Sequence, residues 1–232
     1  MARGPEGPGD PGRAGFEQPM YVVGERWRLP GAEGDGAQAT LAETFASPRD
    51  GGWTGFLLGQ VDVKRPLLWV QERMAILESG RVHPPGFLFD DLIHVEARDP
   101  KAALWAMEEG LRCAAIGTVI GEIWGDPAAL DFTATRRLAV AAERHGVAAF
   151  LVRLGGTANL SGARLRWRVA SAPSLPHPLN PRAPGAAAWS CELFRARGSP
   201  PGTWQLTHEA GGFHLVAEPF HRALGEGERR TG

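Results

Sequence analysis

One glycine-rich segment near the start of the chain has the spacing of a phosphate-binding loop. Residues 31–38 read GAEGDGAQ, and the motif GxxxxGK[ST] requires a lysine and then a hydroxyl residue after its last glycine. Ala37 stands where that lysine would neutralise the β- and γ-phosphates, and Gln38 stands where Ser or Thr would hold magnesium. Glu33 and Asp35 bring two negative charges into the loop. Tight ATP binding is therefore not expected, and no cofactor is predicted.

This degenerate loop has two interpretations. Its defining positions are Gly31, Gly36, Ala37 and Gln38. In the first, the loop descends from a nucleotide site, and backbone N–H groups at the start of a following helix could still attract an anion. In the second, the spacing arises by chance, because a chain with 31 glycines produces such matches easily. In neither case is the loop catalytic.

Two other positions that ATP hydrolysis needs are also altered. The apolar run 118–123 has Gly121 where the aspartate of a Walker B strand would follow, and Glu122, one step later, is expected on the opposite face. Glu72, just after an apolar strand, is the one candidate for a catalytic glutamate. Together these changes favour a protein without catalytic residues. A divergent ATPase that uses Glu72 and backbone amides is the enzymatic alternative.

The segments that must position these residues alternate between strand and helix signals. Asp99 with Pro100, and later Asp131, are typical helix starts, and the second helix is expected to end near Gly146. The strands are expected at 21–29, 66–70, 92–97, 115–123 and 147–154, a helix at 37–46, and either element at 53–61. Alternation of this kind predicts an α/β fold with a mostly parallel sheet flanked by helices.

The last third of the chain has a different pattern. Residues 164–169 alternate charged and apolar side chains, which is typical of a half-buried strand, and 189–197, 203–208 and 213–217 are further strand candidates. These indicate antiparallel C-terminal strands that extend the sheet. The expected organisation is a disordered tail (1–18), an α/β core with the degenerate loop (19–155), an antiparallel extension of the same domain (156–224) and a flexible tail (225–232).

Positive charge gathers in the second half of the chain. Residues 1–130 hold 12 Lys and Arg against 19 Asp and Glu, whereas residues 131–232 hold 13 against 7. Arginine suits carboxylate and phosphate partners, so this half could face DNA or an acidic protein surface. Alternatively, the arginine excess follows from GC-rich coding, or these arginines lie on solvated surfaces without a partner. The candidate contacts are Arg136 and Arg137 in one helix, and Arg164, Arg166 and Arg168 along one strand face.

Several classes of protein find no support in the sequence. No apolar run approaches the roughly 18–20 residues that span a bilayer, and the first residues lack the apolar centre of a secretory signal, so we expect a cytoplasmic protein. Two separated cysteines and seven scattered histidines predict no metal site. Trp69, Trp105 and Trp124 are expected in the core.

Several blocks together resemble the ImuA family of bacterial RecA-like proteins. The resemblance runs from about residue 66 to 217. Its most specific blocks are LLWVQERMAI (67–76), ALWAMEEGLRCAA (103–115), VIGEIWGDPAALDFTATRRLAVAAE (119–143), RWRVASAPS (166–174) and ELFRARG (192–198). The order and spacing of these blocks make the match specific, and the first 65 residues match only through the degenerate loop.

The resemblance implies a RecA-like core and a role in the SOS response, in which damage-induced mutagenesis accompanies translesion synthesis. It implies contacts with a polymerase-like partner of the ImuB type and with RecA, in a system that includes an error-prone DnaE-type polymerase. It also implies an accessory protein without established catalytic activity. Weak or indirect contact with DNA is left open. A damage-induced inhibitor of cell division is a further alternative, because related small proteins block the division polymer.

Overall fold

A computed structural model describes most of the chain. The described residues are 22–26, 29–30, 32–33, 36–62, 64–83, 91–177, 179–209 and 212–217. The tails expected at 1–18 and 225–232 lie outside them, and the boundary expected at 155/156 stays a prediction. None of the helices in the described part of the chain combines the length and the apolar character needed to cross a bilayer.

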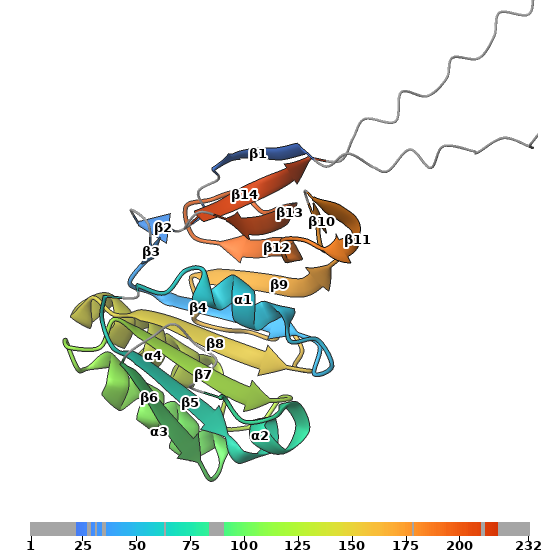
Figure 1. Cartoon of the computed structure of the whole chain (residues 1–232). Helices are drawn as coiled ribbons and strands as arrows, with labels where there is room; N and C mark the ends of the chain where they lie inside the picture. Colours follow the sequence, from blue (N-terminus) through green and yellow to red (C-terminus); the bar gives the residue numbers. More distant parts are fainter. Residues whose placement is uncertain are drawn as a thin grey trace, which may run out of the picture.

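Ten of the described strands form one mixed sheet (Figure 1). In spatial order it runs β1 (Val22–Arg26), β14 (Gly212–Ala217), β13 (Gly202–Glu209), β12 (Ala188–Ala196), β9 (Leu165–Ala172), β4 (Leu41–Ala46), β8 (Ala148–Leu154), β7 (Thr118–Trp124), β5 (Leu67–Glu72) and β6 (Leu92–Ala97). From β9 to β6 every neighbouring pair is parallel, and from β1 to β9 every pair is antiparallel. The predicted α/β class, mostly parallel with antiparallel C-terminal strands, is confirmed.

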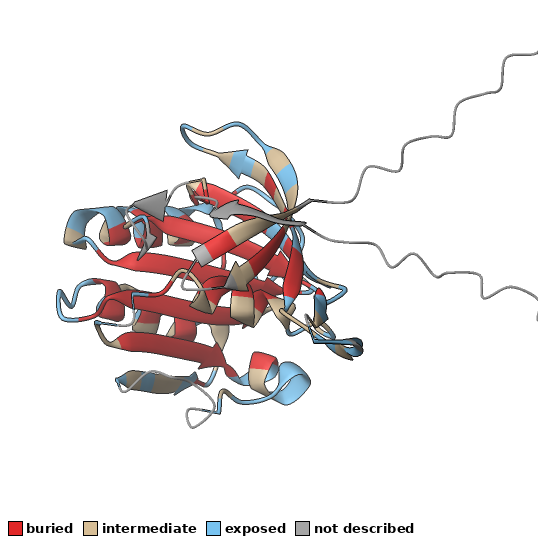
Figure 2. Cartoon of the chain, turned by 45° about the horizontal axis from the view of Figure 1, so that its top comes forward, coloured by how far each residue is buried: buried red, intermediate tan, exposed pale blue. Residues whose placement is uncertain are grey.

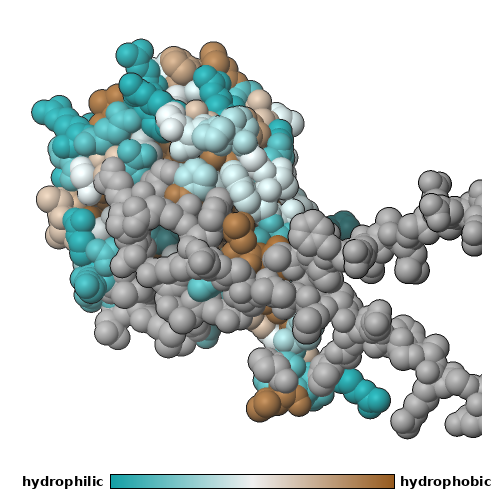
Figure 3. All heavy atoms as spheres, turned by 90° about the horizontal axis from the view of Figure 1, so that it is seen from above, coloured by the Kyte–Doolittle hydropathy of each residue, from teal (hydrophilic) through white to brown (hydrophobic). Residues whose placement is uncertain are grey.

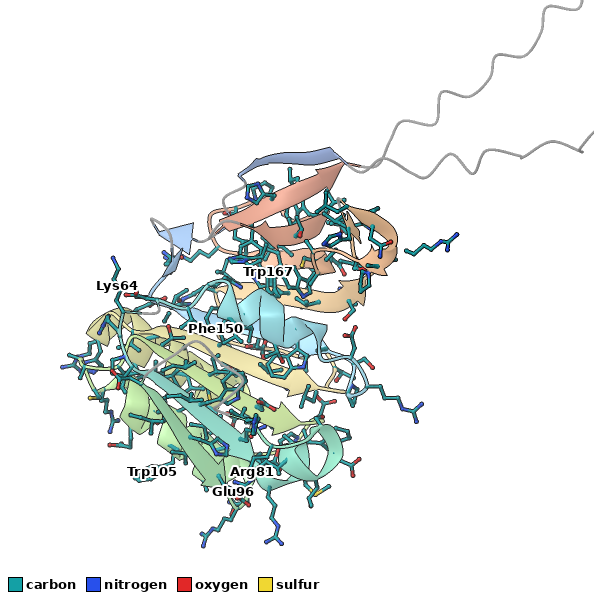
Figure 4. The ribbon with its side chains drawn as sticks, in the orientation of Figure 1. Lys64, Arg81, Glu96, Trp105, Phe150 and Trp167 are labelled. Carbon is teal, nitrogen blue, oxygen red and sulfur yellow. The ribbon has the colours of Figure 1, made fainter. Side chains whose placement is uncertain are left out.

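Helices cover both faces of the parallel half. On one face lies α1 (Gly52–Leu58), whose Phe56 packs edge-on against Trp167 of β9, with ring centroids 5.4 Å apart (Figures 1 and 4). On the other face lie α3 (Pro100–Leu111) and α4 (Phe132–His145). The short α2 (Arg73–Ser79) follows β5 directly. Two apolar clusters, one on each face, therefore hold the sheet between the helical layers.

Burial follows this layering. The central parallel strands are buried along nearly their whole length, as expected for a sheet covered on both faces (Figure 2). Strand β9, which pairs parallel with β4 and antiparallel with β12, instead alternates buried and exposed residues toward its end. Seen from the β1 end, the described surface mixes hydrophilic and neutral residues with smaller hydrophobic groups (Figure 3).

Local signals set the ends of α3 and α4. The carboxylate of Asp99 accepts a hydrogen bond from Ala102 N at 2.8 Å, and that of Asp131 accepts one from Ala134 N at 2.7 Å. Each satisfies a backbone donor that the first turn of a helix leaves free. After α4, Gly146 adopts a left-handed conformation with φ of 69°, which glycine tolerates without strain. The predicted starts and the predicted end are confirmed.

The expectation of a helix at 37–46 is wrong. Residues 41–46 form β4, a fully buried strand in the middle of the sheet. The preceding residues form a small hairpin of β2 (Ala32–Glu33) and β3 (Gly36–Ala37). Burial between β8 and β9 has overridden the helical preference of Ala, Leu and Glu in this segment. A further hairpin, β10 (Pro176–His177) with β11 (Asn180–Pro184), lies within a proline-rich stretch between β9 and β12.

The segment before β9 packs tightly against α4. A methyl group added at Gly162 would lie 2.5 Å from Arg136 Cα and 2.6 Å from Arg136 N. Because these atoms are helix backbone, they cannot rotate away, and Gly162→Ala is expected to lower the free energy of unfolding by about 1–3 kcal/mol. Urea unfolding followed by tryptophan fluorescence measures this loss.

A second glycine supplies the matched control for that measurement. Gly51 has negative φ (−82°) and nothing within 4 Å of an added methyl group. Gly51→Ala should therefore leave stability within about 0.5 kcal/mol. Equal stability of the two variants would contradict the close packing of residue 162 on α4.

Candidate functional site

A pocket of about 380 Å³ lies where α1 and α2 meet the central strands. Ligands of α/β proteins bind at the carboxyl ends of parallel strands, where the connecting loops leave a crevice. The loop between β4 and α1 forms one wall of the pocket, and the residues that follow α2 form another. Its lining includes Asp50, Trp53, Trp69, Gln71, Arg81 and Glu122. By its place in the sheet, this pocket is the candidate functional site.

The loop from β4 to α1 has the strand–loop–helix arrangement of a phosphate-binding motif. Residues 47–54 read SPRDGGWT, so Gly52 and Thr54 fall on the last glycine and the hydroxyl position of GxxxxGK[ST]. Trp53 stands at the lysine position. Its side chain is buried, and its ring centroid lies 6.2 Å from that of Trp69. An indole thus packs into the core where a cation would reach toward phosphate.

A carboxylate also occupies the start of α1. Asp50 accepts hydrogen bonds from Gly52 N at 2.9 Å and from Ser171 N at 2.7 Å, and Ser171 Oγ donates to it as well. Burial alone would raise the pKa of this carboxyl, but the hydrogen bonds from Ser171 and Gly52 outweigh it and hold the pKa below its ordinary value. The negative charge therefore stays in place where an incoming phosphate would meet it.

A second carboxyl group lies deeper in the pocket. Glu122 of β7 is 2% exposed, and its oxygens accept hydrogen bonds from Trp69 Nε1 and from Gln71 Nε2, the latter at 3.1 Å. Burial raises the pKa of Glu122 to about 7, although both hydrogen bonds act in the opposite direction. Gln71 is held in turn by Val82 N, which donates to its side-chain oxygen at 2.8 Å, and by His94 Nε2 at 3.0 Å. The network fixes Gln71 with its amide directed at Glu122.

Glu72 does not belong to this pocket. Its neighbour Gln71 faces α1, so Glu72 faces the α3 side of the sheet, where it accepts a hydrogen bond from Trp124 N at 2.9 Å. Burial raises the pKa of Glu72, and the nearby negative charge of Asp99 raises it further. The hydrogen bond from Trp124 N acts in the opposite direction and lowers it. Glu72 and Glu122 therefore lie on opposite faces of the sheet. Gly121 belongs to β7, the strand between β5 and β8, and packs against Met107 of α3.

The degenerate loop predicted at 31–38 lies elsewhere. Gly31 is outside the described residues, Gly36 and Ala37 form β3, and Gln38 is exposed. None of the described residues of this loop lines the pocket, and β4 follows them where the motif needs a helix. Sequence reasoning missed the segment at 47–54 because the missing lysine removes the residue by which the motif is found. The remaining signal was Gly52 and Thr54 at the correct spacing in the first turn of an apolar helix.

Beside the site, β4 carries a buried ionic cluster. Glu43, which is 0% exposed, accepts from Arg166 Nε at 2.7 Å and from Arg153 Nη1 at 3.2 Å. Arg153 also pairs with Asp126, which lies two residues after the end of β7. The guanidinium of Arg166 lies 5.2 Å from the ring centroid of Phe45. This cluster ties β4 to both of its neighbours, β8 and β9.

The three arginines expected as a strip on one strand are separated by these contacts. Arg166 is buried in the cluster of Glu43, so an exposed strip that includes it is wrong. Arg164 precedes β9 and pairs with Glu143 of α4 at 2.6 Å. Arg168 is exposed, pairs with Glu192 at 2.9 Å and lies 4.2 Å over the ring of Phe194. The surface charge of Arg164 and Arg168 is thereby partly neutralised.

Arg136 and Arg137 both lie on the outer side of α4. Arg137 pairs with Glu108 of α3, and Arg136 is exposed. Near them, Trp105 of α3 is 64% exposed and lies on the outer side of its helix (Figure 4). The expectation that Trp105 is a core residue is therefore wrong, whereas Trp69 is buried and Trp124 packs partly against the core, as expected.

The fold and the site together define the class of protein. The sheet is mostly parallel with helices on both faces, and a strand–loop–helix unit begins at the carboxyl end of β4. These features define a RecA-like α/β protein. No protein-family model matches the chain. Over 183 residues the chain is 33% identical to Protein ImuA of Caulobacter vibrioides, in strains NA1000/CB15N and CB 15, and the match covers 72% of each protein. The chain belongs to the ImuA family.

Proposed function

We propose that this chain is a non-catalytic accessory protein of damage-induced translesion synthesis. In this role it bridges a polymerase-like partner of the ImuB type and RecA, within a system that includes an error-prone DnaE-type polymerase. Membership in the ImuA family supports a role in translesion synthesis, and the buried Trp53 with the neighbouring carboxylate of Asp50 in the β4–α1 loop supports a non-catalytic mode of action. A chain that hydrolyses no nucleotide acts through its contacts.

The observation that carries the proposal is the buried Trp53 at the lysine position of the β4–α1 loop. Catalysis of phosphoryl transfer depends on a cation that bridges the β- and γ-phosphates. An indole supplies none, and Asp50 adds an anion at the helix start. Glu122, which points toward the same pocket, is buried among neutral hydrogen-bond donors and lacks a neighbouring cation in its hydrogen-bond network. Each of the three features disfavours a magnesium–triphosphate complex.

Nucleotide binding and turnover test the non-catalytic role. The purified protein with Mg–ATP is expected to release phosphate at the rate of a buffer control, with and without single-stranded DNA. Isothermal titration with ATP is expected to give no saturable binding at millimolar nucleotide. The variant Trp53→Lys should not gain turnover, because Asp50 remains at the start of α1. DNA-stimulated turnover that Glu72→Ala abolishes would contradict the proposal and identify a divergent ATPase.

Recovery of partners tests the bridging role. The tagged protein, isolated from cells treated with a DNA-damaging agent, is expected to retain the polymerase-like subunit and RecA together. Filamentation of cells on overexpression, in a strain without the polymerase-like subunit, would instead indicate an inhibitor of cell division. Recovery of neither partner from damaged cells would overturn the bridging role.

A further inference from the structure

A groove of about 280 Å³ runs between α3 and α4 on the outer surface of the molecule. It lies on the face of the sheet opposite α1, so the pocket beside Trp53 and this groove are separate. Its lining consists of Glu108, Arg112, Thr133, Arg136, Arg137, Val140, Ala141, Arg144 and His145. The nine residues come from two helices whose other faces are buried in the core, so their backbone positions are firmly fixed.

The charge of this groove is strongly one-sided. Four arginines line it, against the single carboxylate of Glu108. That carboxylate is shared, because both Arg112 and Arg137 pair with it. Within the part of the chain that the structure describes, no ion pair involves Arg136 or Arg144. The groove thus keeps an excess of guanidinium groups that are free to meet carboxylates from another molecule.

The same groove has an apolar side. Val140 is 47% exposed and lies on it next to Ala141. Trp105, one turn before Glu108 on α3, is 64% exposed on the outer side of the same helix, although it is not one of the residues that line the groove. An exposed valine with arginines around it, on a helix pair that also exposes a tryptophan, has the composition of a protein-binding surface.

We propose that the α3/α4 groove binds an acidic amphipathic helix of a protein partner. Acidic side chains of that helix pair with Arg136 and Arg144, and an apolar side chain packs on Val140 and Ala141. From residue 133 to residue 145 the groove wall is about 18 Å long at the rise of an α-helix, which matches about three turns of a partner helix. The apolar floor favours a peptide over a nucleic acid backbone, which offers phosphates but no apolar anchor. This inference rests on the proposed bridging role and adds the surface through which the chain binds one of its partners.

A designed peptide tests the groove directly. The probe is a fluorescein-labelled 18-residue helix with Leu at positions i, i+4, i+7 and i+11 and Glu at most others, compared with a scrambled peptide of the same composition. Fluorescence anisotropy should show that the purified protein binds the helix, and that binding weakens as NaCl increases. The double variant R136E/R144E is expected to weaken binding about tenfold or more, which is 1.4 kcal/mol or more. Val140→Ser is expected to weaken it as well.

The matched control reverses two arginines elsewhere on the surface. Arg73 on α2 and Arg195 on β12 are exposed, and R73E/R195E changes the net charge by the same amount. This control should bind the peptide within about twofold of the wild type, because net charge acts weakly at a distance beyond the Debye length. Equal losses in the two double variants, or equal binding of the scrambled peptide, would overturn the proposal. Tighter binding of a single-stranded dT20 oligonucleotide, lost in R136E/R144E but kept in Val140→Ser, would assign the groove to nucleic acid instead.

Partner recovery separates the groove from the bridging role. If the wild type recovers the polymerase-like subunit and RecA from damaged cells, R136E/R144E should lose one of them and R73E/R195E should keep both. Unchanged recovery by R136E/R144E would remove the groove and leave the translesion role standing. If the wild type recovers neither partner, the translesion role fails, and the peptide measurement alone decides whether the groove binds acidic helices.

Discussion

Replacing Glu43 with alanine is expected to lower the free energy of unfolding by about 3–5 kcal/mol, a large part of the stability of an ordinary domain. The side chain is 0% exposed and accepts hydrogen bonds from two buried guanidinium groups, those of Arg153 and Arg166. Removing the carboxylate leaves both cations in the interior with less compensation. Arg153 keeps Asp126, whereas among the described residues Arg166 keeps the aromatic rings of Phe45 and Phe194 and no carboxylate. Urea unfolding at pH 7 measures the effect.

A surface ion pair provides the control for this prediction. Glu192 and Arg168 are 2.9 Å apart, with both side chains well exposed to water. Glu192→Ala is expected to cost less than about 1 kcal/mol, because solvent screens an exposed pair. If Glu43→Ala were no more damaging than Glu192→Ala, the buried cluster would not hold β4 between its neighbours.

The second large effect is a dependence of stability on pH that comes from Glu122. Its pKa is about 7 in the folded protein, against an ordinary value of 4.5. A raised pKa means that folding favours the protonated carboxyl, so the contribution is fully present below about pH 4.5 and is lost as pH rises through about 7. At about 1.4 kcal/mol per unit of pKa, the loss is about 3 kcal/mol. Unfolding in urea at pH 5, 6, 7 and 8 follows it.

Glu122→Gln isolates this carboxyl from the other groups that titrate in the same range. The glutamine side chain stays neutral, and its oxygen can still accept from Trp69 and Gln71. Burial and the charge of Arg81 lower the pKa of His94, which opposes the trend, but His94 is present in both proteins and cancels in their difference. The variant should gain stability relative to the wild type as pH rises from 5 to 8. A difference that does not change with pH would show that Glu122 titrates as an ordinary surface carboxyl does.

Short-range signals made α3 and α4 predictable from sequence. Asp99 and Asp131 cap these helices through contacts three residues along the chain, and the apolar side chains of α3 repeat at helical spacing. Such information is local, so it survives without knowledge of the tertiary structure. The same holds for the buried strands β7 and β8, whose continuous apolar runs indicate burial on both faces.

The site was less predictable because it depends on distant contacts. Glu43 is buried only because Arg153 and Arg166 reach it across 110 and 123 residues, and without them the segment around β4 is composed like a helix. Trp53 can be assigned to the lysine position of the phosphate-binding motif only once β4 is known to be a central strand. Arg166 belongs to a pattern that predicts exposure, and its burial follows from its pairing with Glu43. In each case the local pattern was consistent with two structures, and long-range pairing selected one.

The pairing of β1 with β14 has a consequence for how the molecule assembles. These strands come from opposite ends of the described chain, with Val22 opposite Ala217, yet they lie side by side at the outer margin of the sheet. During synthesis β1 leaves the ribosome first and finds its neighbour last, after some 190 further residues have been made. Contacts of such high sequence separation form slowly. The pairing of β1 with β14 therefore forms late. Before β1 joins them, β12, β13 and β14 can already form their hairpins.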